Sequence, residues 1–538
     1  MSEWKNKLFF GDNLDILRNE IKDQTIDLIY LDPPFNSKAN YNLLFKSPKG
    51  HSSHAQIEAF EDTWHWSEQA EAEFAELIHQ PNTDVAEMIQ ALRRFLGEND
   101  MMAYLTMMAN RLLQLSRVLK RTGSIYLHCD PTASHYLKIV LDGVFGKEQF
   151  QNEIVWQRTN VHSDSKTWSR VSDTIFFYTK SSEFVWNPPY KPHSKEYLNT
   201  KYRYKDPDGQ VYRLDNMTSP NPRPNMMYEW RGHASPPAGW RYSKETMAKL
   251  DAEGRIWYPD EKTKRPQLKR YLKMGGTLMG TVWTDIPPIN SQAQERLGYP
   301  TQKPLALLER IIQASSNCGD LILDPFCGCG TAIYASEKLD RRWIGIDITH
   351  LAISLVEKRL RDSFLGIDFD VHGTPKDLDS ARDLAFRDKY QFQWWACSLV
   401  NAQPFGGKKK GADSGIDGVI YFQDDKSPAK KIIVSVKGGE NISVAMIRDL
   451  GHVVEREKAE IGLFVTLVSP TRPMKEEAIK AGYYTGFSGV SFPKLQILTI
   501  DGLLNGTERA KYPDLMQGGL TFKKAQVQRA DTKQEPLF

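Results

Sequence analysis

The stretch that decides the fold reads Leu321-Ile-Leu-Asp-Pro-Phe-Cys-Gly-Cys-Gly-Thr331. It joins a short apolar strand to a helical segment near 331–339, and the following strand, 343–347, ends on Asp347. An acidic residue roughly 20 positions after the first glycine of such a loop is typical of a βαβ unit in which the acid accepts hydrogen bonds from a ribose. The third glycine of the G-x-G-x-x-G pattern is missing, which favours a cofactor with ribose and adenine but no pyrophosphate. S-adenosylmethionine fits that description, and a tight βα turn with no ligand is the alternative.

The two cysteines of this loop, Cys327 and Cys329, raise the question of a metal site. No second Cys or His pair at zinc spacing accompanies them, so we expect small residues in a crowded loop and no metal. The five cysteines of the chain are scattered rather than framed, which suits a reducing compartment.

A second motif, Asp32-Pro-Pro-Phe35, follows the strand-like run 26–31. Pro33 and Pro34 can continue neither a strand nor a helix, so the backbone must turn there. The Asp32 carboxylate and the Pro33 carbonyl are two acceptors that could bind the N–H groups of an exocyclic amine and so make its lone pair available. Phe35 would stack on a base flipped out of the duplex. A simple strand-ending turn is the alternative.

The periodicity of the chain around these motifs predicts the α/β class. A helix over 102–121, a strand over 124–129 and a helix near 303–316 alternate with the strands already named. Such alternation predicts a parallel sheet with helices on both faces. The periodicity of helices and strands fades from about 160 to 285. The strands of the sheet are therefore expected to come from two separated segments of the sequence.

Together these motifs resemble the amino-methylating DNA methyltransferases of the β group, which modify adenine N6 or cytosine N4. The resemblance covers roughly residues 8–362 and includes four further pieces: Gly11-Asp-Asn13, Gly123-Ser-Ile-Tyr-Leu-His-Cys-Asp130, Glu153-Ile-Val-Trp156 and Thr301-Gln-Lys-Pro304. It implies a Rossmann-like methyltransferase sheet that uses S-adenosylmethionine and carries an inserted target-recognition region. Residues 30–37 look most like adenine-N6 enzymes, including modification subunits of type III restriction systems, because cytosine-N4 enzymes more often carry Ser where Asp32 stands. Phe35 replaces the commoner Tyr.

The resemblance also implies roles at the cofactor. Asp12 would contact the adenine, Asp347 the ribose, and Lys303 the methionine carboxylate. The other residues expected to bind the cofactor are Asn13, Asp324, Phe326, Gly328, Gly330 and Thr331.

The region between the two halves of the sheet is basic. The whole chain has a net charge of only +3, but residues 191–275 hold 18 Lys and Arg against 10 Asp and Glu, whereas residues 1–100 hold 9 against 18. Basic and aromatic residues interspersed in this way suit double-stranded DNA, although a solvated loop domain is the alternative. The candidate DNA contacts are Arg203, Arg213, Arg231 and Arg241.

A third unit near the C-terminus contains Ser414-Gly-Ile-Asp417 and, further on, Ile432-Ile-Val-Ser-Val-Lys437. These segments resemble the PD-(D/E)xK core of restriction endonucleases, in which acids bind Mg²⁺ and a lysine helps to activate water. Ser435 stands where a second acid belongs, so Asp417 and Lys437 alone make a poor metal site. We expect a module that holds DNA or assists assembly; Mg²⁺ is expected only if the domain is an active nuclease.

The expected organisation is as follows: 1–159, catalytic half; 160–290, inserted target-recognition region; 291–365, cofactor-binding half; 366–389, linker; 390–520, smaller α/β nuclease-like domain; 521–538, tail. No run of residues approaches the ~18–20 apolar positions of a membrane helix, and the N-terminus lacks the pattern of a signal peptide, so we expect a cytoplasmic protein.

The function expected from these observations is site-specific methylation of adenine N6 in double-stranded DNA. Three alternatives stay open: a cytosine-N4 methyltransferase, a bifunctional enzyme that also cleaves DNA, and a nicotinamide-dependent oxidoreductase. The last is disfavoured because its glycine pattern is incomplete and it has no use for Asp32-Pro-Pro-Phe35. A homodimer and a partner endonuclease are possible because similar enzymes often have them.

Overall fold

The computed structural model describes residues 4–33, 40–46, 52–61, 65–161, 166–261, 263–272, 276–290, 293, 295–297, 299, 301–405, 415–424, 429–513 and 521. Within these residues no helix is long and apolar enough to cross a membrane.

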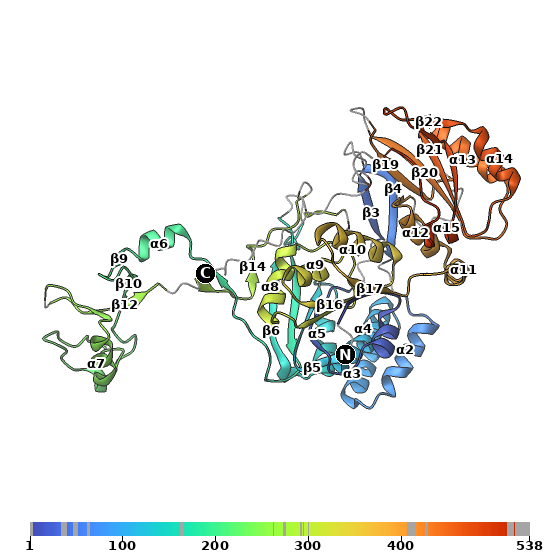
Figure 1. The fold of residues 1–538 in the computed structure, drawn as a ribbon. Helices are drawn as coiled ribbons and strands as arrows, with labels where there is room; N and C mark the ends of the chain where they lie inside the picture. The colour runs from blue at the N-terminus through green and yellow to red at the C-terminus, as the bar shows by residue number, and fades with distance from the viewer. Residues whose placement is uncertain are drawn as a thin grey trace. The chain divides into compact units, whose positions relative to one another are not determined.

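A nine-stranded sheet forms the centre of the larger part of the chain (Figure 1). In spatial order its strands are β14 (Val282–Trp283), β6 (Phe150–Gln157), β7 (Ser172–Thr179), β5 (Leu119–Cys129), β2 (Ile26–Leu31), β15 (Leu321–Asp324), β16 (Arg342–Asp347), β1 (Asn6–Phe10) and β17 (Phe369–His372). All neighbouring pairs from β5 to β17 are parallel, whereas β7 runs antiparallel to both β5 and β6. The expected α/β class is therefore confirmed, with one reversed strand.

Helices cover both faces of this sheet, because its strands are apolar on both sides. One face carries α1 (Asn13–Glu20), α2 (Glu68–Ile78), α3 (Thr83–Leu96), α4 (Asp100–Val118) and α5 (Ser134–Phe145). The other face carries α8 (Leu305–Ser315), α9 (Thr331–Lys338) and α10 (His350–Ser363). The hairpin of β3 (Asn40–Lys46) and β4 (Ser52–Glu61) lies between β2 and α2 in the chain. The separated halves of the sequence thus meet in one sheet, where β2 lies directly beside β15.

The inserted region is shorter than the range 160–290 that we expected. Strand β7 lies within that range, yet it pairs with β5 and β6 of the main sheet. A separate compact unit spans Pro188–Gly280. Its elements are β8 (Tyr190–Lys191), α6 (Lys195–Lys201), β9 (Tyr204–Lys205), β10 (Val211–Asn216), η2 (Pro224–Met226), α7 (Lys244–Ala252), β11 (Ile256–Trp257), β12 (Gln267–Tyr271) and β13 (Thr277–Leu278). A four-stranded antiparallel sheet, β11-β12-β10-β9, packs on the buried Trp240 and Met247.

The expectation of a linker over 366–389 is wrong. Strand β17 extends the main sheet by pairing with β1, and α11 (Leu378–Arg387) follows it. The polar composition of this segment misled the prediction because β17 is an edge strand with half-buried residues and α11 exposes most of its surface.

A smaller five-stranded sheet forms the C-terminal domain. In spatial order its strands are β18 (Gln403–Pro404), β19 (Gly418–Phe422), β20 (Lys430–Lys437), β21 (Ile461–Thr466) and β24 (Leu495–Thr499). The remaining elements are α12 (Lys389–Leu399), α13 (Val444–Arg456), α14 (Arg472–Lys480), β22 (Tyr483–Thr485), β23 (Ser491–Pro493) and α15 (Ile500–Leu504). Strands β20, β21 and β24 are parallel, and two apolar cores cover the two faces.

Candidate active site

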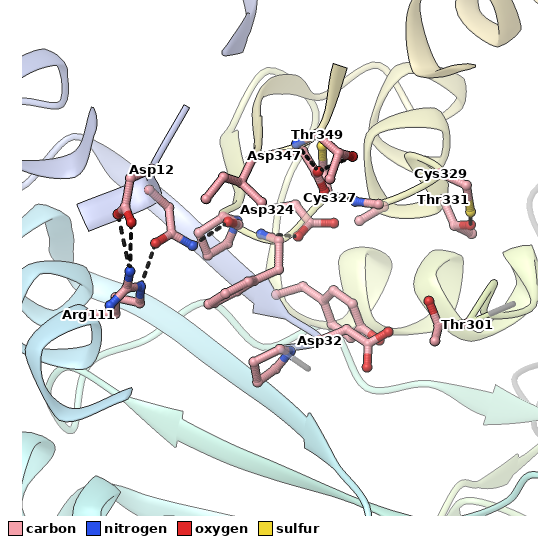
Figure 2. Close-up of a pocket in the computed structure, with 18 of the residues that line it drawn as sticks. Asp12, Asp32, Arg111, Thr301, Asp324, Cys327, Cys329, Thr331, Asp347 and Thr349 are labelled. Carbon is pink, nitrogen blue, oxygen red and sulfur yellow. Dashed lines mark hydrogen bonds and ion pairs between the residues drawn. The ribbon is translucent and has the colours of Figure 1, made fainter. Parts of the chain in front are cut away.

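A cavity of about 370 Å³ opens where four adjacent parallel strands end (Figure 2). The strands are β2, β15, β16 and β1. Asp324 and Asp347 are the last residues of β15 and β16, whereas Asp32 and Asp12 follow β2 and β1. The carboxyl ends of parallel strands are where open α/β sheets bind ligands. The motifs that we singled out in sequence therefore converge on one site, although they lie far apart along the chain.

The acceptor loop contributes Asp32 and Pro33 to this cavity. The Nζ atom of Lys303 lies 2.5 Å from Oδ2 of Asp32, and both side chains are largely buried. The other oxygen, Oδ1, is buried and has no hydrogen-bond partner among the described residues. A buried acceptor without a donor is costly unless a ligand supplies one. Pro34 and Phe35, which we predicted to act with Asp32, lie outside the described residues.

Lys303 was expected beside the carboxylate of the cofactor. Its ammonium group instead pairs with Asp32 in this structure, while the residue still lines the cavity.

A chain of buried hydrogen bonds begins at Tyr30, two residues before Asp32 of the acceptor loop. The hydroxyl of Tyr30 lies 3.0 Å from Nδ1 of His128, and Nε2 of His128 lies 3.0 Å from Oδ2 of Asp173. Burial, and next the charge of Asp32, raise the pKa of Tyr30 well above its usual value. Burial alone would also raise the pKa of Asp173, but its hydrogen bond with His128 leads the interactions that lower it overall. Sequence reasoning missed this chain, because its members come from β2, β5 and β7.

The cofactor loop turns sharply at two glycines with positive φ, Gly328 (47°) and Gly330 (72°). A Cβ atom on Gly330 would lie 2.7 Å from Val356 of α10, so only glycine fits there. The backbone N–H of Gly328 donates to Oδ2 of Asp347 over 2.9 Å. The backbone N–H and the hydroxyl of Thr349 donate to Oδ1 of Asp347 over 2.9 and 2.8 Å. These bonds fix the Asp347 carboxylate at the cavity.

Burial raises the pKa of two acids of the cavity, Asp347 and Asp324. Burial raises the pKa of Asp347 to about 6. Burial also raises the pKa of Asp324 well above its usual value, and the nearby charges of Asp32 and Asp347 act in the same direction. Burial of this kind favours the uncharged form of a carboxyl group.

The start of α1, directly after β1, contributes the N-cap residue Asp12 and the first helical residue Asn13, both of which accept hydrogen bonds from Arg111 of α4. Arg111 was not among the residues predicted from sequence. A signal for it existed: one arginine stands among the apolar residues of a helix that is buried on most of its surface.

The remaining predicted cofactor residues lie as follows. Phe326, Gly328 and Thr331 line the cavity, whereas Gly330 lies beneath it as the N-cap residue of α9. Cys327 and Cys329 are buried free thiols in the cavity wall. The described residues contain no cluster of His, Cys, Asp and Glu that could hold a metal ion.

The four candidate DNA-binding arginines all belong to the unit Pro188–Gly280. Arg203 and Arg241 are exposed, and Arg213 is half-buried on β10. Arg231 is also exposed, but it forms an ion pair with Asp251.

In the nuclease-like motif of the C-terminal domain, both carboxylate oxygens of Asp417 accept hydrogen bonds from the protein. Oδ1 of Asp417 accepts a hydrogen bond from Gln393 over 2.7 Å, and Oδ2 accepts one from the backbone N–H of Val436 over 2.6 Å. Nζ of Lys437 lies 3.9 Å from the same carboxylate. Ser435, at the place of the second acid, is buried and brings no charge. These contacts engage the carboxylate oxygens that would bind Mg²⁺ in an active nuclease.

Helix α12 of this domain also packs on the outside of the cofactor loop. Trp394 is buried against Tyr299, Cys329 and Leu351. The Gln391 side chain accepts a hydrogen bond from the backbone N–H of His350 over 3.0 Å. Since Tyr299 and Cys329 line the cavity, α12 supports its wall.

Residues 26–358 match the family model described as DNA methylase, N6_N4_Mtase, which spans more than half of the chain. The chain belongs to this DNA methylase family. Membership confirms the resemblance stated from the sequence motifs. It also settles the cofactor as S-adenosylmethionine, the methyl donor of such methylases.

Curated relatives of the methylase include a type II methyltransferase and a subunit of a type III restriction–modification enzyme. The type II methyltransferase M.EcaI of Enterobacter cloacae is 35% identical over 261 residues, which are 48% of this chain and 57% of that protein. The Mod subunit of the type III restriction–modification enzyme StyLTI of Salmonella typhimurium is 26% identical over 355 residues, 62% of this chain and 50% of that protein. The chain thus spans about half the length of the curated relatives it matches.

The C-terminal domain matches a second family model over residues 402–504, described as NACHT-associated inactive Restriction Endonuclease 1. This match confirms the restriction-endonuclease-like assignment. The word inactive agrees with the engaged carboxylate of Asp417 and with the serine at position 435.

Solved structures with a similar arrangement include two methyltransferases. TTHA0409 of Thermus thermophilus, complexed with S-adenosyl-L-methionine, has a TM-score of 0.31 at 15% identity and covers 68% of this chain and 99% of its own. The cytosine-N4-specific PvuII DNA methyltransferase has a TM-score of 0.31 at 11% identity and covers 65% and 85%. Scores this low carry no argument about the chemistry of the site.

Proposed function

We propose that the methylase is a site-specific DNA methyltransferase that transfers the methyl group of S-adenosylmethionine to the exocyclic N6 of adenine in a flipped-out base. The single observation that carries this proposal is Oδ1 of Asp32, a buried acceptor at the cavity for which the described residues supply no donor. An exocyclic amine has two N–H donors, and one of them would satisfy this oxygen.

The chemistry follows from the partners of Asp32. The amine of adenine is a poor nucleophile because its lone pair is delocalised into the ring. Hydrogen bonds from its N–H groups to Oδ1 of Asp32 and to the carbonyl of Pro33 localise that lone pair and stabilise the positive charge that develops on nitrogen. Lys303 holds Oδ2, so the carboxylate keeps one orientation and turns Oδ1 to the substrate. The nitrogen then forms a bond to the methyl carbon while the bond from that carbon to sulfur breaks, S-adenosylhomocysteine leaves, and the nitrogen releases a proton to solvent.

The cavity fits S-adenosylmethionine, which supplies the methyl group. Asp347 accepts hydrogen bonds from the ribose, and Asp12 accepts from the adenine. Phe326, Gly328 and Thr331 line the same cavity. Lys303 lies close enough to the acceptor loop to serve both Asp32 and the carboxylate of the methionine portion.

Adenine is favoured over cytosine by the acid at position 32, since cytosine-N4 enzymes more often carry Ser there. The unit Pro188–Gly280, with its exposed Arg203 and Arg241, is proposed to read double-stranded DNA. The names of the curated relatives support a place in a restriction–modification system. The C-terminal domain is proposed as a module that holds DNA or assists assembly without cutting it.

Transfer of a radiolabelled methyl group to DNA tests this function. The purified full chain is incubated with tritiated S-adenosylmethionine and unmethylated bacterial DNA, and the DNA is then digested to nucleosides. We expect the label in N6-methyl-2′-deoxyadenosine. Label in N4-methylcytosine would contradict the choice of base, and no label in DNA of varied sequence would contradict the function.

A further inference from the structure

Two helices that carry none of the sequence motifs close one end of the cavity. Gln69 and Glu73 of α2 line it together with Met107 and Arg111 of α4. Figure 2 shows Arg111 beside Asp12 at one end and Asp32 with Thr301 towards the other. The end formed by α2 and α4 is therefore built by residues that no motif predicts.

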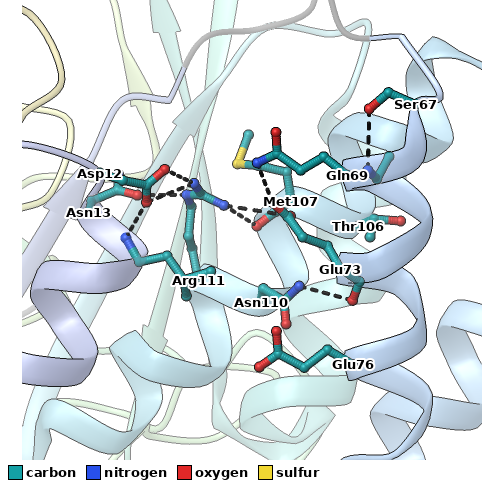
Figure 3. Close-up of polar contacts among 12 residues, drawn as sticks. Asp12, Asn13, Ser67, Gln69, Glu73, Glu76, Thr106, Met107, Asn110 and Arg111 are labelled. Carbon is teal, nitrogen blue, oxygen red and sulfur yellow. Dashed lines mark hydrogen bonds and ion pairs between the residues drawn. The ribbon is translucent and has the colours of Figure 1, made fainter. Parts of the chain in front are cut away.

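Arg111 is the centre of the polar contacts at this end (Figure 3). Its side chain is only 8% exposed. Its Nε donates to Oδ1 of Asn13 over 2.6 Å, and one terminal nitrogen donates to both oxygens of Asp12 over 3.1 and 3.0 Å. The other terminal nitrogen donates to the carbonyl of Met107 over 3.2 Å and lies 3.9 Å from the carboxylate of Glu73. The guanidinium thus pairs with two acids and orients one amide.

The side-chain amide of Asn13 connects Arg111 to the cofactor loop through two hydrogen bonds. Because Arg111 donates to its Oδ1, the Nδ2 group must point the other way, and it donates to the carbonyl of Pro325 over 2.8 Å. Pro325 and Phe326 line the cavity directly after β15. Arg111 of α4 is therefore hydrogen-bonded to the residues that follow β1 and, through Asn13, connected to the residue that follows β15.

Removing the cation would change the charge of the same end. Asp12 and Glu73 would face the cavity as two acids without the buried guanidinium between them. A partly buried carboxylate that loses its partner is unfavourable, so both side chains would turn towards solvent. Asn13 would lose the donor that fixes its orientation. Its hydrogen bond to the carbonyl of Pro325 would then no longer be fixed in place.

We propose that Arg111 is a positioning residue for the nucleoside portion of the cofactor, acting through Asp12 and Asn13. This inference rests on the proposed function for the identity of the ligand. The reacting amine is held at Asp32, and Lys303 beside it offers a cation to a carboxylate, so the nucleoside portion extends towards Arg111. Arg111 then sets how firmly adenosine is held and does not itself take part in methyl transfer.

Calorimetry on the full chain without DNA tests this role with two ligands. S-adenosylhomocysteine carries both the nucleoside and the amino acid portion, whereas 5′-methylthioadenosine lacks the amino acid. The variants are Arg111→Met, Arg111→Lys and, as a matched control on the same helix, Arg117→Gln. Arg117 also bonds carbonyl groups and an acid, but it lies away from the cavity. Lys303→Met serves as the contrast at the other end.

We expect Arg111→Met to weaken both ligands by the same factor, at least about tenfold. Arg111→Lys should lose less, because an ammonium group can reach Asp12 but cannot also donate to Asn13 in the geometry of a guanidinium. Lys303→Met should weaken S-adenosylhomocysteine and leave 5′-methylthioadenosine unchanged. A general folding defect would not produce this division between the ligands.

Three results would overturn or redirect the account. If Arg111→Lys, which keeps the cation and the fold, binds both ligands as the wild type does, the positioning role is wrong. The role is also wrong if Arg111→Met weakens S-adenosylhomocysteine alone, or if Arg117→Gln causes the same loss. A wild-type protein that binds neither ligand would contradict the proposed function itself.

Discussion

Acidic solution should weaken the binding of S-adenosylmethionine through Asp347. Burial raises the pKa of this carboxyl from 3.8 to about 6, although hydrogen bonds from Thr349 and Gly328 act in the opposite direction. When protonated, Asp347 loses an acceptor for the ribose hydroxyls and the charge that attracts a sulfonium cation. The pH at which it titrates therefore lies within reach of a binding experiment.

The magnitude follows from that pKa. An acid with a pKa of about 6 is roughly nine-tenths ionised at pH 7 and roughly one-tenth ionised at pH 5. If the cofactor binds the ionised form, Kd should rise about tenfold between these two values, or about 1.4 kcal/mol.

The same pKa predicts the opposite sign for the stability of the ligand-free protein. The folded state binds a proton to Asp347 at a higher pH than the unfolded state does. The free energy of unfolding should therefore fall as pH rises from about 4 to about 6, as far as Asp347 contributes. Loss of cofactor binding at pH 5 is then not explained by unfolding through this group.

Isothermal titration calorimetry at pH 5, 6, 7 and 8 measures the effect, with thermal melting at each pH to verify the fold. Asp347→Asn is the matched control, because it has nearly the same shape and no titratable group. Its affinity should be weak at every pH and free of the step near pH 6. A wild-type Kd that stays constant from pH 7 to pH 5 would refute the role of Asp347 at the ribose.

Three further changes test other parts of the structure. Gly330→Ala places a Cβ atom 2.7 Å from Val356 at a positive φ, so it should lower the melting temperature and weaken cofactor binding, with a backbone cost of about 1–2 kcal/mol; an unchanged melting temperature would contradict this reading of the loop. Trp394→Ala leaves a void behind Cys329 and should cost about 3–5 kcal/mol of unfolding free energy in denaturant titrations, whereas a loss below about 1 kcal/mol would mean that α12 does not support the cofactor loop. Lys437→Ala should leave methyl transfer to short duplexes unchanged, and neither it nor the wild type should nick unmethylated DNA with Mg²⁺; a large loss of methylation rate or Mg²⁺-dependent nicking by the wild type would contradict the independence or the inactivity of the domain.

The parts of the site that the sequence predicts are those held in short segments. Asp32 and Asp347 each end or follow an apolar strand, and the loop at 324–331 joins a strand to a helix. Local patterning is enough to place such residues at strand ends, and the carboxyl ends of neighbouring parallel strands must meet. The convergence of these motifs on one cavity therefore follows from local patterning and the geometry of a parallel sheet.

The parts that the sequence missed depend on packing between distant segments. Arg111 belongs to a helix whose other buried positions are mostly apolar, and its role appears only when Asp12 and Asn13 are brought against it. The chain from Tyr30 through His128 to Asp173 joins three strands whose order no local pattern gives.

The predicted boundaries of the inserted region were wrong for a related reason. Strand β7 is buried along nearly its whole length and holds the apolar run 175–178, yet it stands within a stretch whose average composition is polar and rich in proline. Averaging over that stretch hid the strand. The edge strand β17 was hidden in the same way by the charged residues around it.

The acceptor role of Asp32 is the central claim, and the rate of a single methyl transfer by Asp32→Asn tests it most directly. The amide keeps the shape of the carboxylate. Lys303 would take the amide oxygen, so the atom that faces the substrate becomes Nδ2, which donates and cannot accept. We predict a rate that is lower by about 10²–10³-fold in single-turnover measurements, with a Kd for S-adenosylmethionine within about threefold of the wild type, less than one missing hydrogen bond would cause. Transfer at the wild-type rate would contradict the account.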